Sequence, residues 1–419
     1  MTSTASHPPP PLPALVALCV LNHVALSGGR VALALQALRL GVPSLGLGLM
    51  LAPFALTSTL GALPLGRWVD RIGARVPALA GMAITTTALG VSAWHPTLVA
   101  LTLAATAIGL GYTASLIALQ SELARGRSEA SRAAGFSGFA IGTAASGGFG
   151  PFLAGQCMAH AGVHGAFGAL ALVSFAAAYG GAWQARRLLS LRGGVAAARP
   201  ALFSRATLSG LGGLRRLMLA DLLMAFAWNA NGFVVPLLGQ RHGWPADTVG
   251  NLLGAFGVAV VLVRVLPRAW RTRGGDWATI ARALVASGVA LALLPVLAAM
   301  PWPYVLETLL GCGLGSSLPS VLALIEARTP AGRRAEVLGL RQAVLGLGAS
   351  TLPTALGALV AATGLVGALL GFGSALLAAA AAIAPRGSGF KDDRRPASAR
   401  LSTSRAGTRS PDGARRCPR

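Results

Sequence analysis

The chain has 419 residues, of which 54% are hydrophobic and 11% are charged, and its 35 Lys and Arg residues outnumber its 12 Asp and Glu residues. A soluble domain carries roughly twice that charged fraction, so the composition excludes an ordinary soluble protein and indicates a chain that lies mostly in lipid. The single lysine, Lys391, is close to the C-terminus, which excludes a P-loop and other lysine-dependent sites from the apolar part.

Residue types that form catalytic or metal sites are present, but not in the required patterns. The four cysteines form no C-x-x-C pair, the six histidines form no H-E-x-x-H motif, and no segment carries the paired carboxylates typical of hydrolases. We therefore predict that the protein is not an enzyme and holds neither a metal nor a cofactor.

Twelve apolar runs are long enough to cross about 30 Å of hydrocarbon as helices. Their approximate limits are 13–38, 45–66, 76–94, 97–121, 133–157, 165–185, 217–239, 248–266, 278–299, 303–325, 338–360 and 365–384. The sequence therefore predicts an all-α membrane protein of twelve transmembrane helices. Its expected parts are a cytoplasmic segment 1–12, a six-helix half 13–185, a cytoplasmic central loop 186–216, a second six-helix half 217–384 and a basic, disordered cytoplasmic tail 385–419.

Positive charge is concentrated in alternate loops. The loops after spans 2, 4, 6, 8 and 10 with the adjoining ends of the spans, together with the tail, hold 32 of the 35 basic residues, and the exceptions are Arg30, Arg39 and Arg241. Because cytoplasmic loops carry the Lys and Arg excess, we expect both termini in the cytoplasm and the protein in a bacterial inner membrane. Topology then accounts for the basicity, so no nucleic-acid partner is predicted, and we expect a monomer.

The two halves repeat one another at an offset of 202 to 204 residues. Matched pairs include Gly48 with Gly250, Glu122 with Glu326, Pro151 with Pro353, Gly155 with Gly357, and Gly162 with Gly364. Two six-span halves of the same orientation are a transporter design, with the binding site expected between them near the middle of the membrane.

The loop after span 2 carries the first functional motif, which consists of Gly66, Asp70, Arg71, Gly73 and Arg75. A tight turn at Gly73 needs a residue without a Cβ atom, and Asp70 at a helix end can accept charge-assisted hydrogen bonds. The spacing resembles the G-x-x-x-D-R-x-G signature of the major facilitator superfamily.

That resemblance covers roughly residues 12 to 385 and implies a cytoplasmic gate motif that latches the two halves together. Glu122, at the cytoplasmic end of span 4, is the nearest acid for its arginines. The matching loop of the second half is degenerate, because Arg271 stands at the acid position and Glu326 is left as its candidate counter-ion.

Span 5 carries a second motif of small residues, at Gly142, Ser146, Gly150, Pro151, Ala154 and Gly155. It is similar to the antiporter motif of the drug-efflux branches, and such spacing lets helices approach closely while the proline permits a bend. An ordinary packing seam explains the same spacing, and Ala105 stands where the efflux families place an arginine. The similarity of the motif favours export, whereas the packing explanation and Ala105 leave import open.

Ionisable side chains inside spans cost at least about 2.5 kcal/mol each on insertion scales and are candidates for a functional site. We predict a substrate cavity lined by Asn22, His23, Arg30, Tyr112, Thr113, Asn229, Asn231, Glu307, Ser316 and Ser317. Arg30 can hold an anionic substrate group, or pair with Glu307 from the other half when the outer gate is shut. Glu307 is alternatively a proton-coupling group or an acid wetted at the outer rim.

Together these features predict a secondary active transporter of a small solute that works by alternating access. Export is the preferred direction, and proton coupling stays open because no carboxylate lies at the very centre of a span. The alternatives are an importer or facilitator of a small anionic metabolite or sugar and, in another class, a non-transporting membrane sensor or scaffold. The expected partners are the small-molecule substrate, the lipid bilayer and protons.

Overall fold

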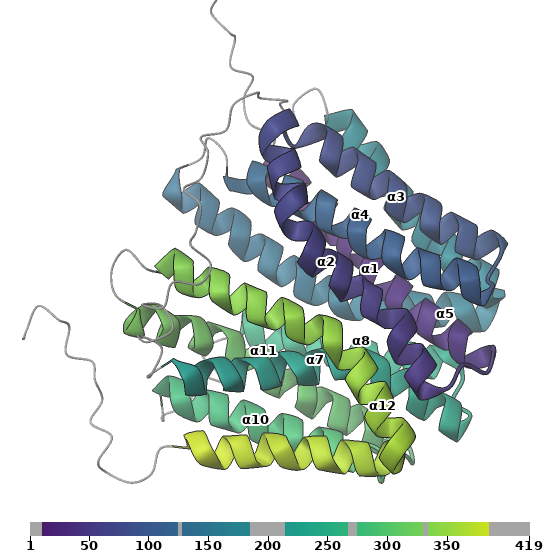
Figure 1. The fold of residues 1–419 in the computed structure, drawn as a ribbon, viewed down its shortest axis with the longest axis vertical. Helices are drawn as coiled ribbons and strands as arrows, with labels where there is room; N and C mark the ends of the chain where they lie inside the picture. The colour runs from purple at the N-terminus through teal and green to yellow at the C-terminus, as the bar shows by residue number, and fades with distance from the viewer. Residues whose placement is uncertain (1–10, 125–127, 185–213, 267–274, 330–333, 385–419) are drawn as a thin grey trace, which may run out of the picture. The chain divides into compact units, whose positions relative to one another are not determined.

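The computed structural model describes residues 11–124, 128–184, 214–266, 275–329 and 334–384, and within these ranges all regular structure is helical (Figure 1). The helices are α1 (Leu12–Arg39), α2 (Ser44–Ile72), α3 (Arg75–Trp94), α4 (Leu98–Ala124), α5 (Glu129–Gln184), α7 (Arg215–His242), α8 (Ala246–Val265), α10 (Gly275–Leu293), α11 (Trp302–Arg328) and α12 (Arg334–Ile383). All ten of these described helices are long and apolar enough to cross a membrane. An all-α membrane fold is thereby confirmed.

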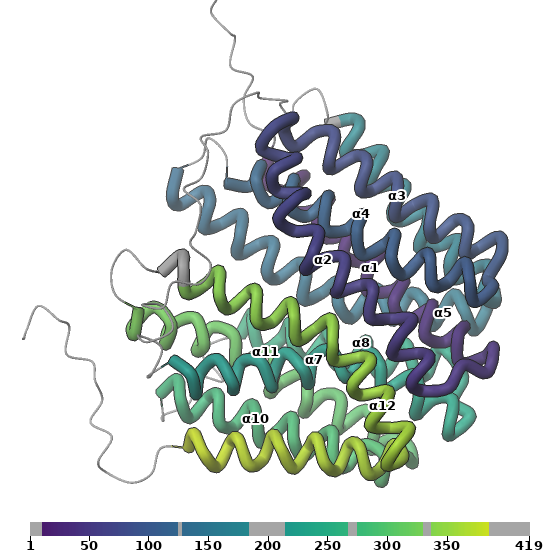
Figure 2. The backbone as a smooth tube through the Cα atoms, in the orientation of Figure 1, coloured from purple at the N-terminus to yellow at the C-terminus, as the bar shows by residue number. Residues whose placement is uncertain are grey.

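Two of the helices are long enough to hold two spans each. α5 has 56 residues and α12 has 50, and each contains one glycine with non-helical backbone angles, Gly162 (φ 69°) and Gly364 (φ 74°). Residues with a Cβ atom rarely adopt a positive φ, so these glycines allow the chain to break its helix. Figure 2 shows α12 reversing direction between its green and yellow segments. The division is consistent with the predicted twelve spans, and the two breaks are repeat-related.

One predicted span ends earlier than expected. The apolar run 278–299 predicts a helix over its whole length, but α10 ends at Leu293 and residues 294–299 are not helical. Pro295 is the physical reason, because a proline cannot continue the hydrogen-bonded ladder and restricts the residue before it. Hydropathy gives the length of the apolar run but does not locate the end of the helix within it.

Glycines bring the two halves together along two seams, one between α2 and α12 and one between α5 and α8. In the α2/α12 seam, a Cβ atom at Gly48 would collide with the carbonyl group of Pro353, and Ser44 Oγ donates a hydrogen bond to Gly357 O at 3.2 Å. Neither backbone could approach so closely with larger residues.

The α5/α8 seam is built in the same way. A Cβ atom at Gly155 would lie 2.7 Å from Gly250 Cα, and one at Gly148 would lie 2.6 Å from Gly257 Cα. Gly250 is the repeat partner of Gly48, and Gly155 is the repeat partner of Gly357. The duplication seen in the sequence therefore produces two equivalent lines of close helix contact.

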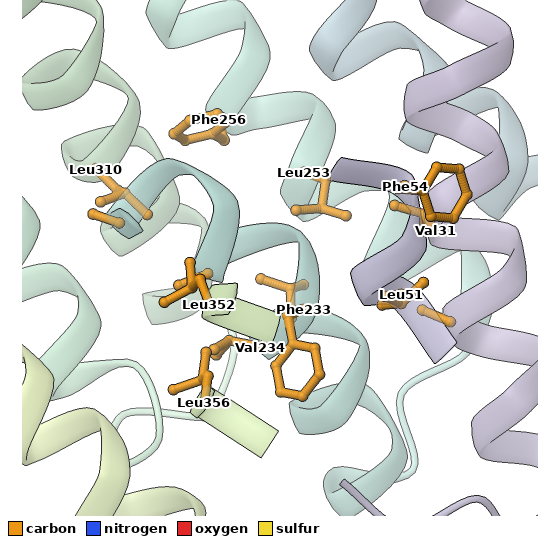
Figure 3. Close-up of a cluster of buried hydrophobic side chains, with 14 of the residues drawn as sticks. Val31, Leu51, Phe54, Phe233, Val234, Leu253, Phe256, Leu310, Leu352 and Leu356 are labelled. Carbon is orange, nitrogen blue, oxygen red and sulfur yellow. The ribbon is translucent and has the colours of Figure 1, made fainter. Parts of the chain in front are cut away.

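The bundle has two ends that differ in charge. We call the end with the α2–α3 connection the Arg-rich end, and the end with the α1–α2 and α7–α8 connections the Arg-poor end. Near the Arg-poor end, apolar side chains of both halves pack together, as Figure 3 shows for Val31, Leu51, Phe233 and Leu356. Two further hydrogen bonds join the halves there, from Gln240 Nε2 to Leu38 O and from Gln156 Nε2 to Asn251 Oδ1, both at 2.9 Å. The Arg-poor end is thus sealed in this structure.

Candidate functional site

A cavity of about 90 Å³ lies between α1, α5, α7 and α8, where side chains of both halves face one another. Its polar lining consists of His23, Ser27, Arg30, Asn229 and Asn231. Four of these five residues belong to the cavity set expected from the sequence. Nonpolar side chains, including Trp228 and Phe256, complete the wall.

Arg30 is the charged residue of this lining. No Asp or Glu is among the residues that line the cavity. Within the parts of the chain that the structure describes, the Arg30 guanidinium makes neither a hydrogen bond nor an ion pair. An unpaired cation at membrane depth is costly, so its exposure to a cavity marks it as the strongest ligand-binding candidate.

His23 is held in place by the neighbouring half-helix of α5. Its Nδ1 atom lies 2.7 Å from Ser146 Oγ, and Ser27 Oγ donates to Ser146 O at 2.8 Å. The Tyr112 ring lies beside the imidazole, with ring centroids 5.7 Å apart. Ser146 of the span-5 motif therefore fixes the polar face of α1 toward the cavity.

Glu307 lies behind the cavity wall, with no exposed surface. Asn231 Nδ2 donates a hydrogen bond to Glu307 Oε2 at 2.8 Å, while Glu307 Oε1 and Asn231 Oδ1 have no partner among the described residues. The ion pair between Arg30 and Glu307 that we expected for a shut outer gate is not formed, although the Arg-poor end is sealed. The Glu307 carboxylate accepts a hydrogen bond from the Asn231 amide instead, and Arg30 faces the cavity.

The other predicted cavity residues do not line the cavity in this conformation. Thr113 Oγ1 lies 2.7 Å from Ser58 Oγ, and the hydroxyls of Ser316 and Ser317 donate to carbonyls of their own helix at 2.8 and 2.9 Å. Serine and threonine hydroxyls in helices commonly donate to a carbonyl of the preceding turn, and sequence spacing does not reveal which of them do so. Asn22 is buried elsewhere, and Tyr112 reaches the site only through the His23 ring.

Two aromatic residues of the wall were missed by the sequence reasoning. The rings of Trp228 and Phe256 meet edge to face, with centroids 5.0 Å apart and an interplanar angle of 73°. The Arg264 guanidinium lies 5.9 Å from the Trp228 ring centroid and donates to Ala140 O at 3.1 Å. The indole is therefore fixed between α7, α8 and the start of α5. The adjacent asparagines drew attention to this stretch of span 7, but not to its aromatic member.

A buried ion pair was also missed. Arg341 Nε lies 2.7 Å from Asp221 Oδ2 and Arg341 Nη2 lies 3.2 Å from Asp221 Oδ1, so α7 and α12 are joined by a two-point contact. The signal in the sequence was Asp221, an acid in the first turns of the apolar span predicted at 217–239. Its partner lies 120 residues away in sequence and could not be chosen from spacing.

The gate motif forms the predicted two-residue connection between α2 and α3. Gly73 has a φ of 84° and ends α2, as the requirement for a residue without a Cβ atom implies. The side chains of Asp70, Arg71 and Arg75 are exposed and make no hydrogen bond or ion pair within the described ranges, while Glu122 is buried on α4. Gly66 borders open space. The expected latch between the halves is therefore not formed by these exposed side chains.

The span-5 motif serves packing in this structure. A Cβ atom at Gly150 would lie 2.7 Å from Gly28 N of α1, one at Gly142 would collide with Val20, and Gly155 contacts α8 as described above. Pro151 lines the cavity. These contacts give the motif a structural role, so any statement about transport direction depends on the resemblance alone.

Two packed helical halves with a polar cavity between them define a membrane protein of the transporter class. The chain belongs to the Major Facilitator Superfamily, whose family model matches residues 15–305 and 217–411. This membership agrees with the resemblance of the gate motif, and it identifies a transporter family and not an enzyme family.

Solved structures of other transporters share the fold. A POT family transporter in complex with 5-aminolevulinic acid is 13% identical, with a TM-score of 0.72 over 89% of this chain and 95% of that one. A mutant of the nucleoside transporter NupG is 15% identical, with a TM-score of 0.70 over 89% and 98%. The human organic anion transporter MFSD10 is 17% identical, with a TM-score of 0.62 over 89% and 100%. A search of curated protein sequences found no match.

Proposed function

We propose that this chain is a secondary active transporter that moves a small solute across a bacterial inner membrane by alternating access, and that it works as an exporter. The observation that carries the proposal is the cavity between the halves, which is lined by Arg30, His23 and two asparagines and lies below a sealed end. A sensor or scaffold would need neither a polar cavity at membrane depth nor glycine seams that let two halves move against each other.

The orientation follows from the loop charges. With the Arg-rich end in the cytoplasm, the Arg-poor end is the outer gate, which is shut here by apolar packing and cross-half hydrogen bonds. The exposed side chains of Asp70, Arg71 and Arg75 then fit an inward-facing state. In the opposite state the gate motif would close the cytoplasmic side while the outer packing separates.

Export is supported by the likeness of span 5 to the drug-efflux motif. The alternative, import or facilitated passage of a small anionic metabolite, is favoured by Arg30 in the cavity. The similar solved structures include peptide, nucleoside and organic anion transporters, so the fold is compatible with many solutes.

Glu307 is the group that we propose to couple transport to protons. It is the acid in direct contact with a cavity residue, through Asn231, and it has one carboxylate oxygen without a partner among the described residues. A proton on Glu307 would change what Asn231 can offer to a solute, because a protonated carboxyl group donates as well as accepts.

The test begins with purified full-length protein and a chemically diverse ligand screen by thermal shift. Each ligand that raises the melting temperature is then followed in proteoliposomes, with and without a pH gradient in either direction. We expect ligand flux through the wild-type protein, and acceleration by a pH gradient that is lost in Glu307→Gln. Binding without flux in any gradient would contradict the transport function and favour a sensor.

A matched pair of glycine variants separates transport from general damage. Gly232 lines the cavity and has no atom within 4 Å of the position of a Cβ atom, so Gly232→Leu should fill the cavity and abolish flux. Gly90 has equally open space on the exposed face of α3, so Gly90→Leu should leave flux unchanged. Equal flux in both variants would exclude this cavity as the pathway.

A further inference from the structure

We propose that the solute is a small monocarboxylate, whose carboxylate is bound by Arg30 and whose flat or short apolar part lies against Trp228 and Phe256. The inference rests on the transport function proposed above and names the substrate class of the same cavity. Charge, hydrogen-bonding capacity and the shape of the lining each support it.

The charge of the lining is positive and uncompensated. Arg30 faces the cavity, and no acid is among the lining residues that the structure describes. Glu307 is engaged by the Asn231 amide, and the Arg264 guanidinium is engaged by Ala140 O and the Trp228 ring. A single available guanidinium favours a single negative charge, and its fork of donors matches a carboxylate in two-point geometry. Arg30 would repel a cationic solute.

The other side-chain donors of the lining are largely committed to the protein itself. Asn229 Nδ2 donates to Ala225 O at 2.8 Å, and Asn231 Nδ2 donates to Glu307. His23 Nδ1 and the Ser27 hydroxyl are both engaged by Ser146. Arg30, which offers five N–H donors, is left as the main hydrogen-bonding group. A sugar needs many donors and acceptors around it, so this lining favours an anion with one polar end.

The space is small and has an aromatic side. The cavity of about 90 Å³ is well below the roughly 300–1,000 Å³ of sites for drug-sized ligands, which favours a small solute. Trp228 and Phe256 form a rigid wall because their edge-to-face contact and the Arg264 guanidinium fix the indole.

Two glycines keep this space open beside the aromatic wall. A Cβ atom at Gly147 would lie 3.8 Å from His23 Cε1 and 4.0 Å from Trp228 Cζ2, so the glycine leaves a slot between imidazole and indole. Gly232 borders open space on the opposite helix. The apolar part of the solute fits this slot, with its charge toward Arg30.

The experiment compares probes of matched shape and different charge on the purified full-length protein in nanodiscs. Benzoate, benzamide and benzylamine are titrated by calorimetry and thermal shift, together with propionate, acetate and glucose. We expect benzoate and propionate to bind at least about tenfold more tightly than benzamide. Benzylamine and glucose should give no heat of binding and no thermal shift beyond those of buffer alone. Failure of every carboxylate to bind at about 10 mM would overturn the proposal, as would equal binding of benzamide and benzoate.

Variants locate the site and control for folding. Arg30→Gln should weaken benzoate binding at least about tenfold, and Arg30→Lys should weaken it less because the charge is kept and the fork is lost. Trp228→Leu should reduce the preference for benzoate over acetate. Arg282→Gln, an exposed arginine of α10, is the matched control and should leave binding unchanged. Unchanged benzoate affinity in both Arg30 variants would overturn the assignment.

Failure of this inference is distinguishable from failure of the transport function. If an amine or a sugar binds and is carried across proteoliposomes, transport stands and the carboxylate class is wrong. If benzoate binds in an Arg30-dependent way but radiolabelled benzoate does not cross the membrane, the cavity binds carboxylates as ligands and the transport function is wrong.

Discussion

The same place in the two halves of this protein is filled with opposite chemistry. In the first half, Cys19 of α1 lies in an apolar cluster against which Phe139 of α5 packs. At the same offset of 202 residues the second half has Asp221 and Arg341, which form the buried two-point ion pair between α7 and α12. The duplication has kept the helix contact and exchanged its side chains, so backbone geometry and not residue chemistry is what the halves share.

The cavity shows a second divergence of the same kind. Arg30 and Gly232 are related by the offset of 202 residues, and both line the cavity. One half therefore supplies the charge and the other half supplies the space. A symmetric pair of arginines would repel each other at membrane depth, whereas this arrangement leaves room for one anion beside one cation.

The largest effect is expected at the ion pair. Asp221→Asn should destabilise the protein by about 3–5 kcal/mol, because it leaves the Arg341 charge buried without a counter-ion. Thermal melting in detergent measures the loss. The double variant Asp221→Cys with Arg341→Phe copies the first half and should recover most of it. An Asp221→Asn protein that melts like the wild type would show that the pair does not hold α7 to α12.

The seams come next. Gly48→Val should cost about 1–3 kcal/mol and impair transport, because the new side chain meets the Pro353 backbone, which cannot give way. Gly250→Val, at the repeat-related place of the other seam, should also lose stability and transport, since a Cβ atom at Gly250 would lie 2.9 Å from Gly155 Cα. Gly90→Val on the exposed face of α3 is the control. Comparable melting and flux in all three variants would contradict the equivalence of the seams.

The apolar counterpart of the ion pair should be far more tolerant. Phe139→Leu keeps an apolar side chain of moderate size and should cost less than about 1.5 kcal/mol by the same melting assay. A loss as large as that of Asp221→Asn would mean that the two halves depend equally on this contact, and the comparison would fail.

The smallest stability effect is expected at the gate motif. Asp70 is exposed in this conformation, so Asp70→Asn should change stability by at most about 0.5 kcal/mol. Flux should nevertheless fall, because the proposed latch acts only when the Arg-rich end closes. Asp276→Asn, at the start of α10 in the degenerate half, should leave flux unchanged. Normal flux in Asp70→Asn would remove the latch from the transport cycle.

The fold was predictable from the sequence because a bilayer leaves few choices. Backbone groups in lipid must bond internally, so apolar runs of sufficient length become helices, and the turn at Gly73 follows from the need for positive φ. The early end of α10 at Leu293 was missed because hydropathy is blind to the effect of Pro295 on the ladder.

The site was predictable only in part. His23, Arg30, Asn229 and Asn231 could be named because polar groups at membrane depth need a reason. Helical hydroxyls such as Ser316 bond to their own helix, and nothing in the spacing distinguishes them from cavity residues.

Pairing was beyond the reach of sequence patterns. The bond of Asn231 to Glu307 and the aromatic contact of Trp228 with Phe256 depend on how separate helices pack, and a single sequence carries no record of that.

Alternating access is tested most directly by paired distances at the two ends of the bundle. Spin labels at Leu40 and His242 report on the Arg-poor end, and labels at Ile72 and Leu338 report on the Arg-rich end, all four sites being exposed. The distances are measured in nanodiscs with and without benzoate and at several pH values. We predict populations in which one distance lengthens as the other shortens. Distances that stay fixed, or that change in the same sense, while solute crosses the membrane would contradict the account.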